Sequence, residues 1–206
     1  MKRFFFLGLF FLTSINIAAA DDLQPVVPAG TGLATAIFAG GRFWYLEPAF
    51  ENLQGVKTVR TGYTGGREEN STYQQVSSGT TGHAEAVEIV YNPKEITYKT
   101  LLDVYWRNVD PTTMDRQFND VGHEYRTVIF YQNEEQHQFA VASKHEIENS
   151  KRYDTEIFME ILPAATFYPA EEDQQKYYKK QPFYYKFCRF ISGRDRFIRN
   201  MWRNKN

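Results

Sequence analysis

Apolar and polar positions change along the chain in blocks that predict a mixture of strands and helices. Residues 33–38 form a short apolar run before two glycines, and this pattern predicts a strand. Apolar residues then recur at helical spacing over residues 43–53, with Gly55 as the stop signal. Residues 56–63 and 84–91 predict two further strands, the second because its side chains alternate in character.

The second half of the chain continues in the same mixed order. Its pattern predicts helices over residues 97–108, 134–149 and 166–180, the last with Pro169 near its first turn, and strands over residues 125–131 and 155–162. No repeat and no linker interrupts this order. Strands and helices that do not strictly alternate favour a single α+β domain built as a two-layer sandwich.

Two long polar segments, residues 64–82 and 112–124, separate these elements. The first is rich in Gly, Ser and Thr. This first segment is long for an unstructured connection, and such loops are more often functional than accidental.

The first 20 residues have the pattern of a secretory signal peptide. Lys2 and Arg3 precede an apolar run over residues 4–17, and three alanines at 18–20 precede two acidic residues. The run is shorter than the roughly 20 residues that span a bilayer, so an uncleaved membrane anchor is the less favoured alternative. We therefore expect a signal peptide at 1–20, a leader at 21–32, the domain at 33–194 and a basic tail at 195–206, in a periplasmic or secreted protein.

Charge and cysteine content narrow the functional classes. Without Lys2 and Arg3, 22 basic residues remain against 25 acidic ones, a formal charge of about −3 that argues against nucleic-acid binding. Cys188 is the only cysteine, so no intramolecular disulfide can form, and we expect a buried, inert thiol. The four histidines show no metal-ligand pattern, and we expect no bound cofactor.

Motifs distributed along the domain carry a more specific signal. In order, they are GGRFW at 40–44, GYTGG at 62–66, NSTY at 70–73, SGTTGHAE at 78–85, WRNVDP at 106–111, QFND at 117–120 with YR at 125–126, and FYPAE at 167–171. Together they resemble the A-type peptide methionine sulfoxide reductase (MsrA) family over residues 35–194. The resemblance implies a ferredoxin-like plait with a mixed sheet and packed helices, and a monomer that acts on methionine-S-sulfoxide in peptides or proteins, repairing oxidative damage.

The resemblance also implies a site. Phe43 and Trp44 would form an apolar wall for the methyl group of the substrate. The sulfoxide oxygen would lie among Tyr73, Glu85, Asp120 and Tyr125. A carboxyl group among apolar walls has a raised pKa, so Glu85 could stay protonated and act as the acid that turns the departing oxygen into water. Taken singly, each residue has a structural explanation: the two aromatic residues as core, Glu85 as a solvated strand residue. We expect His83 to have a structural role in its loop.

The sequence departs from the family pattern at the most important position. Arg42 stands where the resemblance implies the cysteine nucleophile, and a guanidinium neither attacks sulfur nor cycles between oxidation states. Arg42 could instead donate to a sulfoxide oxygen, or close the pocket by pairing with Glu85 or Asp120. Ser192 stands where relatives carry a resolving cysteine, and Gln174 replaces a histidine. We do not expect Cys188 to take over, because its aromatic neighbours predict burial.

Three functions remain open at this stage. The favoured one is a catalytically defective homologue, a pseudoenzyme that binds methionine sulfoxide without reducing it. The second is an active reductase that uses a thioredoxin-like partner, with Arg42 a recent mutation or an error in the sequence, or with Cys188 bypassing it. The third is an interaction protein that uses the basic tail, for example at a membrane surface.

Overall fold

The computed structural model describes residues 31–203. The predicted signal peptide and the leader up to residue 30 lie outside the described residues. Within residues 31–203, no helix is long and apolar enough to cross a membrane.

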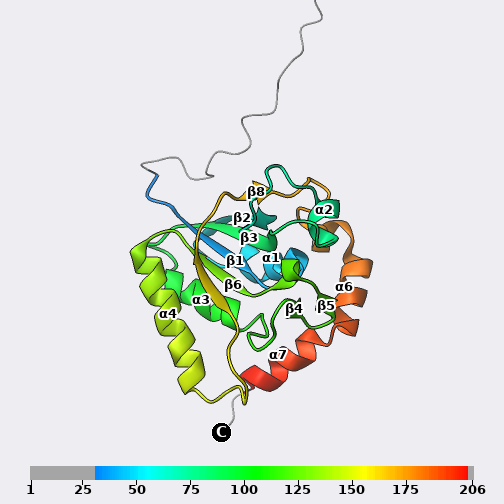
Figure 1. Ribbon diagram of the computed structural model, residues 1–206. Coiled ribbons are helices and arrows are strands. Elements are labelled where there is room, and N and C mark those ends of the chain that lie inside the picture. Colours follow the sequence, from blue (N-terminus) through cyan, green and yellow to red (C-terminus); the bar gives the residue numbers. More distant parts are fainter. Residues whose placement is uncertain (1–30, 204–206) are drawn as a thin grey trace, which may run out of the picture.

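A six-stranded sheet forms the centre of the domain (Figure 1). Its order is β7-β6-β1-β3-β2-β8, and all neighbouring strands are antiparallel except the parallel pair β6 and β7. The strands are β1 (Ala34–Ala39), β2 (Val56–Thr64), β3 (Ala84–Tyr91), β6 (Val128–Tyr131), β7 (Glu160–Pro163) and β8 (Tyr168–Pro169). This mixed sheet with packed helices confirms the predicted α+β fold.

Three helices pack on one face of the sheet and enclose the main core. They are α1 (Phe43–Glu51), α3 (Tyr98–Trp106) and α4 (Glu134–Asn149). Successive side chains along a strand point to opposite faces of the sheet. Val87 and Ile89 of β3 therefore face these helices, together with Glu85. Ala84 and Ala86 face the other side, where Phe167 and Phe130 cover them. The same alternation therefore places the carboxyl group of Glu85 beneath the first turn of α1.

The helix that the sequence predicts over residues 166–180 is wrong. This segment instead forms the short edge strand β8, a run of turns and the single-turn helix α5 (Tyr177–Lys180). The Gln175 side chain accepts from the Thr61 N–H at 2.9 Å and donates to the Thr61 carbonyl at 2.8 Å. The backbone of the segment is also bonded to β2, since the Ala170 N–H donates to the Thr61 carbonyl at 2.9 Å. Pro169, which lacks an N–H, is tolerated because β8 lies at the sheet edge.

Three smaller predictions also need correction. The strand predicted over residues 155–162 is limited to β7, and Tyr125 belongs to the 3-10 helix η1 (His123–Tyr125) rather than to β6. The two long polar segments are partly ordered into elements of their own. The first contains α2 (Tyr73–Ser77), and the second contains the hairpin of β4 (Arg116–Gln117) and β5 (Asp120–Val121).

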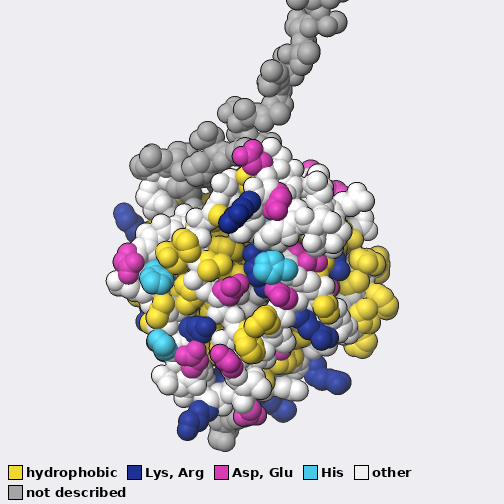
Figure 2. Space-filling model, viewed as in Figure 1, with side chains coloured by type: hydrophobic (Ala, Val, Ile, Leu, Met, Phe, Trp, Pro, Cys, Tyr) yellow, Lys and Arg dark blue, Asp and Glu magenta, His cyan; other side chains and the backbone are white. Residues whose placement is uncertain are grey.

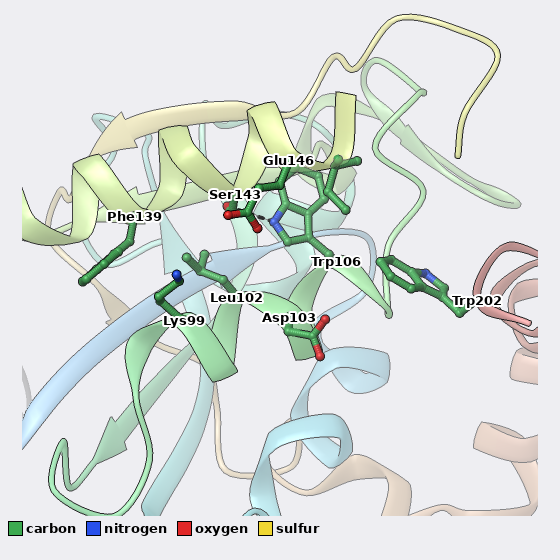
Figure 3. A pocket seen from close by; sticks show the side chains of 9 residues that line it. Lys99, Leu102, Asp103, Trp106, Phe139, Ser143, Glu146 and Trp202 are labelled. Carbon is green, nitrogen blue, oxygen red and sulfur yellow. Dashed lines mark hydrogen bonds between the residues drawn. The ribbon is translucent and has the colours of Figure 1, made fainter. Parts of the chain in front are cut away.

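Two helices complete the C-terminal part, α6 (Pro182–Ile191) and α7 (Arg194–Trp202). The apolar side chains of α7 pack back on the domain: Phe197 contacts the ring of Phe118, and Trp202 closes a small pocket between α3 and α4 near Trp106 (Figure 3). In contrast, α6 contains no buried residue. The predicted burial of Cys188 is therefore wrong, since its side chain is partly exposed.

We predict that Gly62→Ala lowers the free energy of unfolding by about 1–3 kcal/mol, because overpacking a close contact costs this much. A methyl group at Gly62 would collide with the Tyr168 carbonyl and lie 2.5 Å from the Phe167 ring. Gly82→Ala is the matched control, since its methyl group would meet nothing closer than 3.4 Å. Urea unfolding of both variants measures the difference, and equal midpoints would contradict the prediction.

Candidate functional site

The site is built where the chain leaves β1 and enters α1. Gly41 has φ +79°, and a Cβ atom there would lie 2.7 Å from Arg194 Nη2 and 2.8 Å from Gln117 Cβ. Only glycine fits both restrictions. The Gly41 N–H donates to the Tyr125 carbonyl at 3.1 Å, which ties this turn to η1. Arg42 is consequently held at the N-cap of α1, with its side chain free to point away from the helix.

The Arg42 guanidinium lies among four of the predicted site residues. Its Nε donates to Asp120 Oδ1 at 2.7 Å, and its Nη1 donates to the Tyr73 hydroxyl at 3.0 Å. Its central carbon lies 5.4 Å from the ring centroid of Trp44 and 5.2 Å from that of Tyr125. Arg42 therefore pairs with Asp120 and not with Glu85, which settles one of the two pairings left open by the sequence.

Burial and charge act on Arg42 in opposite directions. Burial by itself lowers the pKa of the guanidinium, but the charge of Asp120 and the hydrogen bond to it outweigh burial, so the net pKa of Arg42 is raised. The Arg42 side chain retains 28% exposure. A protonated guanidinium thus occupies the mouth of the site at every physiological pH.

Glu85 lies below the guanidinium and is fully buried. Its Oε2 accepts from the Phe43 N–H at 3.1 Å, while its Oε1 has no hydrogen-bond partner among residues 31–203. Burial raises the pKa of Glu85 to about 8, although Arg42 and the Phe43 N–H both oppose the shift. The carboxyl group is therefore mostly protonated at neutral pH, in line with its predicted role as a hydrogen-bond donor. The prediction of a solvated strand residue does not hold.

Aromatic side chains form the wall of the site. Trp44 stacks on Tyr177 with ring centroids 3.9 Å apart and planes 11° apart, and its Nε1 donates to Gln174 Oε1 at 3.2 Å. Tyr73 stacks against the other part of the indole at 5.8 Å. Phe43 is fully buried, and its ring centroid lies 6.1 Å from that of Tyr73. It therefore supports the aromatic wall from the side of the core.

The two tyrosines beside Arg42 remain protonated. Burial raises the pKa of both Tyr73 and Tyr125, and the nearby Arg42 only partly offsets this. Their hydroxyl groups are thus available as hydrogen-bond donors. Together with Glu85, they surround the guanidinium with neutral polar groups.

His83 lies outside this cluster and has the structural role that the sequence predicts. Its Nδ1 accepts from the Gly66 N–H at 3.1 Å, and its other ring nitrogen lies 2.7 Å from the Glu68 carbonyl oxygen. These bonds hold the loop between β2 and α2. In residues 31–203, no group of three or more His, Cys, Asp or Glu side chains is arranged to hold a metal ion.

Sequence reasoning missed Arg194, which supports the turn from behind. This side chain is fully buried, and its Nη1 donates to the Asn108 carbonyl at 2.6 Å. Its guanidinium lies between the rings of Tyr45 and Phe118, at 4.9 and 4.7 Å. The sequence around it is rich in basic residues, so nothing in the pattern separates this buried arginine from its solvated neighbours.

Glu171 was also missed, although it belongs to the FYPAE motif. Its two carboxylate oxygens accept from the Tyr63 hydroxyl and from the Tyr73 N–H, both at 2.8 Å. Glu171 thereby positions the start of α2 and the ring of Tyr73. Its place at the end of the FYPAE motif was the signal in the sequence that could have identified it.

The chain is similar in sequence to known proteins. The sequence model of the family described as "Peptide methionine sulfoxide reductase" matches residues 34–206. Among curated proteins, a peptide methionine sulfoxide reductase MsrA from Halalkalibacterium halodurans is 49% identical over 170 residues, covering 82% of this chain and 97% of the relative. An MsrA from Methanosarcina mazei is 45% identical over 168 residues, covering 82% of this chain and 80% of the relative.

Solved structures show the same similarity. The reduced form of Mxr1 from Saccharomyces cerevisiae superposes with a TM-score of 0.70 at 30% identity, covering 75% of this chain and 88% of the other. Methionine sulfoxide reductase A of Corynebacterium diphtheriae superposes with a TM-score of 0.66, also at 30% identity, covering 75% and 77%.

We predict that the stability of the wild-type protein depends on pH through Glu85. A pKa raised from 4.5 to about 8 means that the folded state holds this proton more tightly than the unfolded chain does. The stabilisation is complete below pH 4.5 and is lost as the pH rises through 8. Relative to Glu85→Gln, the wild type should lose up to about 1.4 kcal/mol per pH unit in this range.

Urea unfolding of both proteins at several pH values between 5 and about 8 measures this difference. Other titrating groups are common to both proteins and cancel in the comparison. Parallel stability curves would show that the Glu85 carboxyl is ionised in the folded state at neutral pH.

Proposed function

Because the chain belongs to the peptide methionine sulfoxide reductase family, we propose that its site binds methionine sulfoxide in peptides or proteins but does not reduce it with a thiol. The observation that carries this proposal is the place of Arg42. Its side chain starts at the N-cap of α1 and ends among Trp44, Tyr73, Asp120 and Tyr125. The proposal identifies this position with that of the nucleophilic cysteine in the family.

Reduction of a sulfoxide needs a group that attacks sulfur and is itself oxidised. A cysteine at a helix N-terminus suits this step, because the helix dipole and nearby donors stabilise the thiolate. A guanidinium has no comparable lone pair while it is protonated, and the ion pair with Asp120 strengthens its hold on the proton. None of the residues that contact the Arg42 guanidinium, which are Trp44, Tyr73, Asp120 and Tyr125, carries sulfur.

Binding needs an apolar surface for the methyl group and donors for the sulfoxide oxygen, and the site supplies both. Trp44 itself is buried, at 7% exposure, and stacks with Tyr73 and Tyr177. The half-buried Tyr73 is the part of this aromatic cluster that a methyl group would meet first. Within the described residues, Arg42 Nη2 makes no hydrogen bond, so it is free to donate to an incoming oxygen. A charged donor of this kind strengthens a hydrogen bond to a neutral acceptor.

An active reductase is the second candidate, and one observation favours it. Cys188 is partly exposed on α6, and both Cys188 and Arg42 are neighbours of Tyr45 and Tyr177. The only thiol of the chain therefore lies at the rim of the site. Such an enzyme would need an external reductant, for which we propose a thioredoxin-like protein. One structure of yeast Mxr1 is a complex with Trx2, and its similarity to this chain, at 21% identity, concerns the fold.

We further propose that the protein acts in the periplasm or outside the cell. This proposal rests on the signal-peptide pattern of residues 1–20 alone. Its substrates would then be exported proteins or peptides that carry oxidised methionine.

We predict that Arg42→Cys gains thiol-dependent reduction of a methionine-S-sulfoxide peptide with dithiothreitol. The gain over Arg42→Ser should be at least about 100-fold, since loss of a catalytic nucleophile in other enzymes costs far more than that. Arg42→Ser is the matched control because it opens the same space without a thiol. The measured quantity is peptide conversion followed by chromatography.

The same assay on the wild type and on Cys188→Ser separates the two candidates. We expect no turnover from either protein. Turnover by the wild type that disappears in Cys188→Ser would establish the second candidate and overturn the proposed function.

We predict that the wild type binds a methionine-S-sulfoxide peptide at least about 10-fold more tightly than the same peptide with methionine, because a hydrogen bond to a charged donor contributes about 1.5–3 kcal/mol. Arg42→Met should remove this preference while retaining the apolar surface. Isothermal titration calorimetry measures both affinities. Absence of saturation at millimolar sulfoxide peptide would sink the binding proposal, whatever the result of the Arg42→Cys assay.

A further inference from the structure

The outward face of α6 carries large apolar side chains in contact with solvent. Phe183, Phe187 and Phe190 are 90%, 61% and 83% exposed. Their spacing of four and three residues places them on one stripe of the helix. Tyr184 and Ile191 widen the stripe on one side and are also exposed. In Figure 2, hydrophobic side chains gather at the right-hand edge of the molecule, where Figure 1 places α6.

Within residues 31–203, the three phenylalanines of the stripe make no ring contact, whereas Tyr184 at its edge contacts the ring of Tyr177, with centroids 6.4 Å apart. On the opposite side of α6, Tyr185 contacts the ring of Tyr45 at 5.7 Å, and Arg189 pairs with Asp195 at 2.7 Å. These contacts attach the helix to α1 and to α7. The outward phenylalanines contribute nothing comparable, so their apolar character needs another explanation.

The charge of the surrounding segment is strongly one-sided. Residues 176–203 contain nine Lys or Arg residues and a single acidic residue, Asp195, whereas the other 24 of the 25 acidic residues precede position 176. The acidic balance of the protein as a whole thus conceals a basic C-terminal segment. The apolar stripe on α6 lies within this basic segment.

Several of these cations have no partner within the described part of the chain. Lys186, Arg196 and Arg199 are exposed and form no ion pair there, whereas Lys176 and Lys179 pair with Glu51. Lys186 lies about 60° around the helix from Phe183, so it borders the stripe directly. Arg196 and Arg199 lie on the following helix, α7. An exposed apolar stripe bordered by Lys186, with further unpaired cations on the adjoining helix, suits a lipid surface, where anionic headgroups cover an apolar layer.

We propose that α6 is an interfacial helix that docks the protein on the surface of an anionic lipid bilayer. Phe183, Phe187 and Phe190 enter the boundary between headgroups and acyl chains, as the apolar face of such helices does. The unpaired cations remain level with the lipid phosphates, whose negative potential attracts them. The proposal does not depend on the function of the Arg42 site.

The test uses the chain from Asp21 onward, which retains every described element and omits the apolar run at residues 4–17. Co-sedimentation with vesicles of phosphatidylcholine and phosphatidylglycerol measures the partition coefficient, and pure phosphatidylcholine vesicles are the neutral comparison. We expect binding to the anionic vesicles that weakens with added salt. Binding to neutral vesicles should be much weaker.

Two variants separate the apolar and the charged contributions. Phe183→Ser with Phe187→Ser and Phe190→Ser should reduce the partition coefficient on anionic vesicles at least about 10-fold, since three large apolar side chains no longer leave water. Lys186→Gln with Arg196→Gln and Arg199→Gln should reduce it about 10-fold or more on the same vesicles. Met114→Ser, at another exposed apolar side chain, is the control and should leave it unchanged.

Three outcomes would overturn the proposal. The first is no binding of the wild type to anionic vesicles at low salt. The second is equal binding by the wild type and the triple serine variant, which would place the contact elsewhere. The third is a dimer in sedimentation that the serine variant dissociates, without vesicle binding, which would make a second copy of this chain the occupant of the stripe.

Discussion

The turn at Gly41 is the constraint on which the site depends. There the chain leaves the central strand β1 and starts α1 within three residues, between the guanidinium of Arg194 and the side chain of Gln117. The Gly41 N–H also holds η1 in place through the Tyr125 carbonyl. Because both sides of the turn are occupied, the residue that follows has one direction available. Its side chain is delivered into the space between α2, η1 and the first turn of α1.

The positions of the charged side chains around this turn determine which of them form an ion pair. Two carboxyl groups and two guanidinium groups lie close together, yet only one direct ion pair forms, between Arg42 and Asp120. Glu85 is brought close to neutral by burial, and Arg194 relies on carbonyl oxygens and aromatic rings. Burial lowers the pKa of Arg194 to about 10, so it stays protonated. The site therefore presents its positive charge at the mouth and neutral donors beneath it.

Sequence reasoning was accurate where local pattern decides structure and failed where distant contacts decide it. The limits of β3 and α4 match the predicted ranges. Both are decided by neighbouring residues: the alternation along β3, and the first turn of α4, which the structure shows to be capped by the Asn133 side chain. The helix predicted for the segment after Phe167 was wrong, because Gln175 bonds to Thr61 in β2, a strand more than a hundred residues earlier. At the site, four residues that the motifs singled out, Trp44, Tyr73, Asp120 and Tyr125, do lie together around Arg42. It could not decide that Arg42 turns to Asp120, since that choice depends on the burial of Glu85.

The Arg42–Asp120 pair also bears on how easily this position can change. Asp120 is largely buried, and its charge is matched at short range only by Arg42. Replacement of the arginine by a neutral residue leaves a carboxylate in a poorly solvated place, which carries a cost in stability. A change of this arginine to cysteine would therefore lower the stability of the folded protein, because it would leave the Asp120 carboxylate without its partner. The partner that accommodates the arginine thus also opposes its loss.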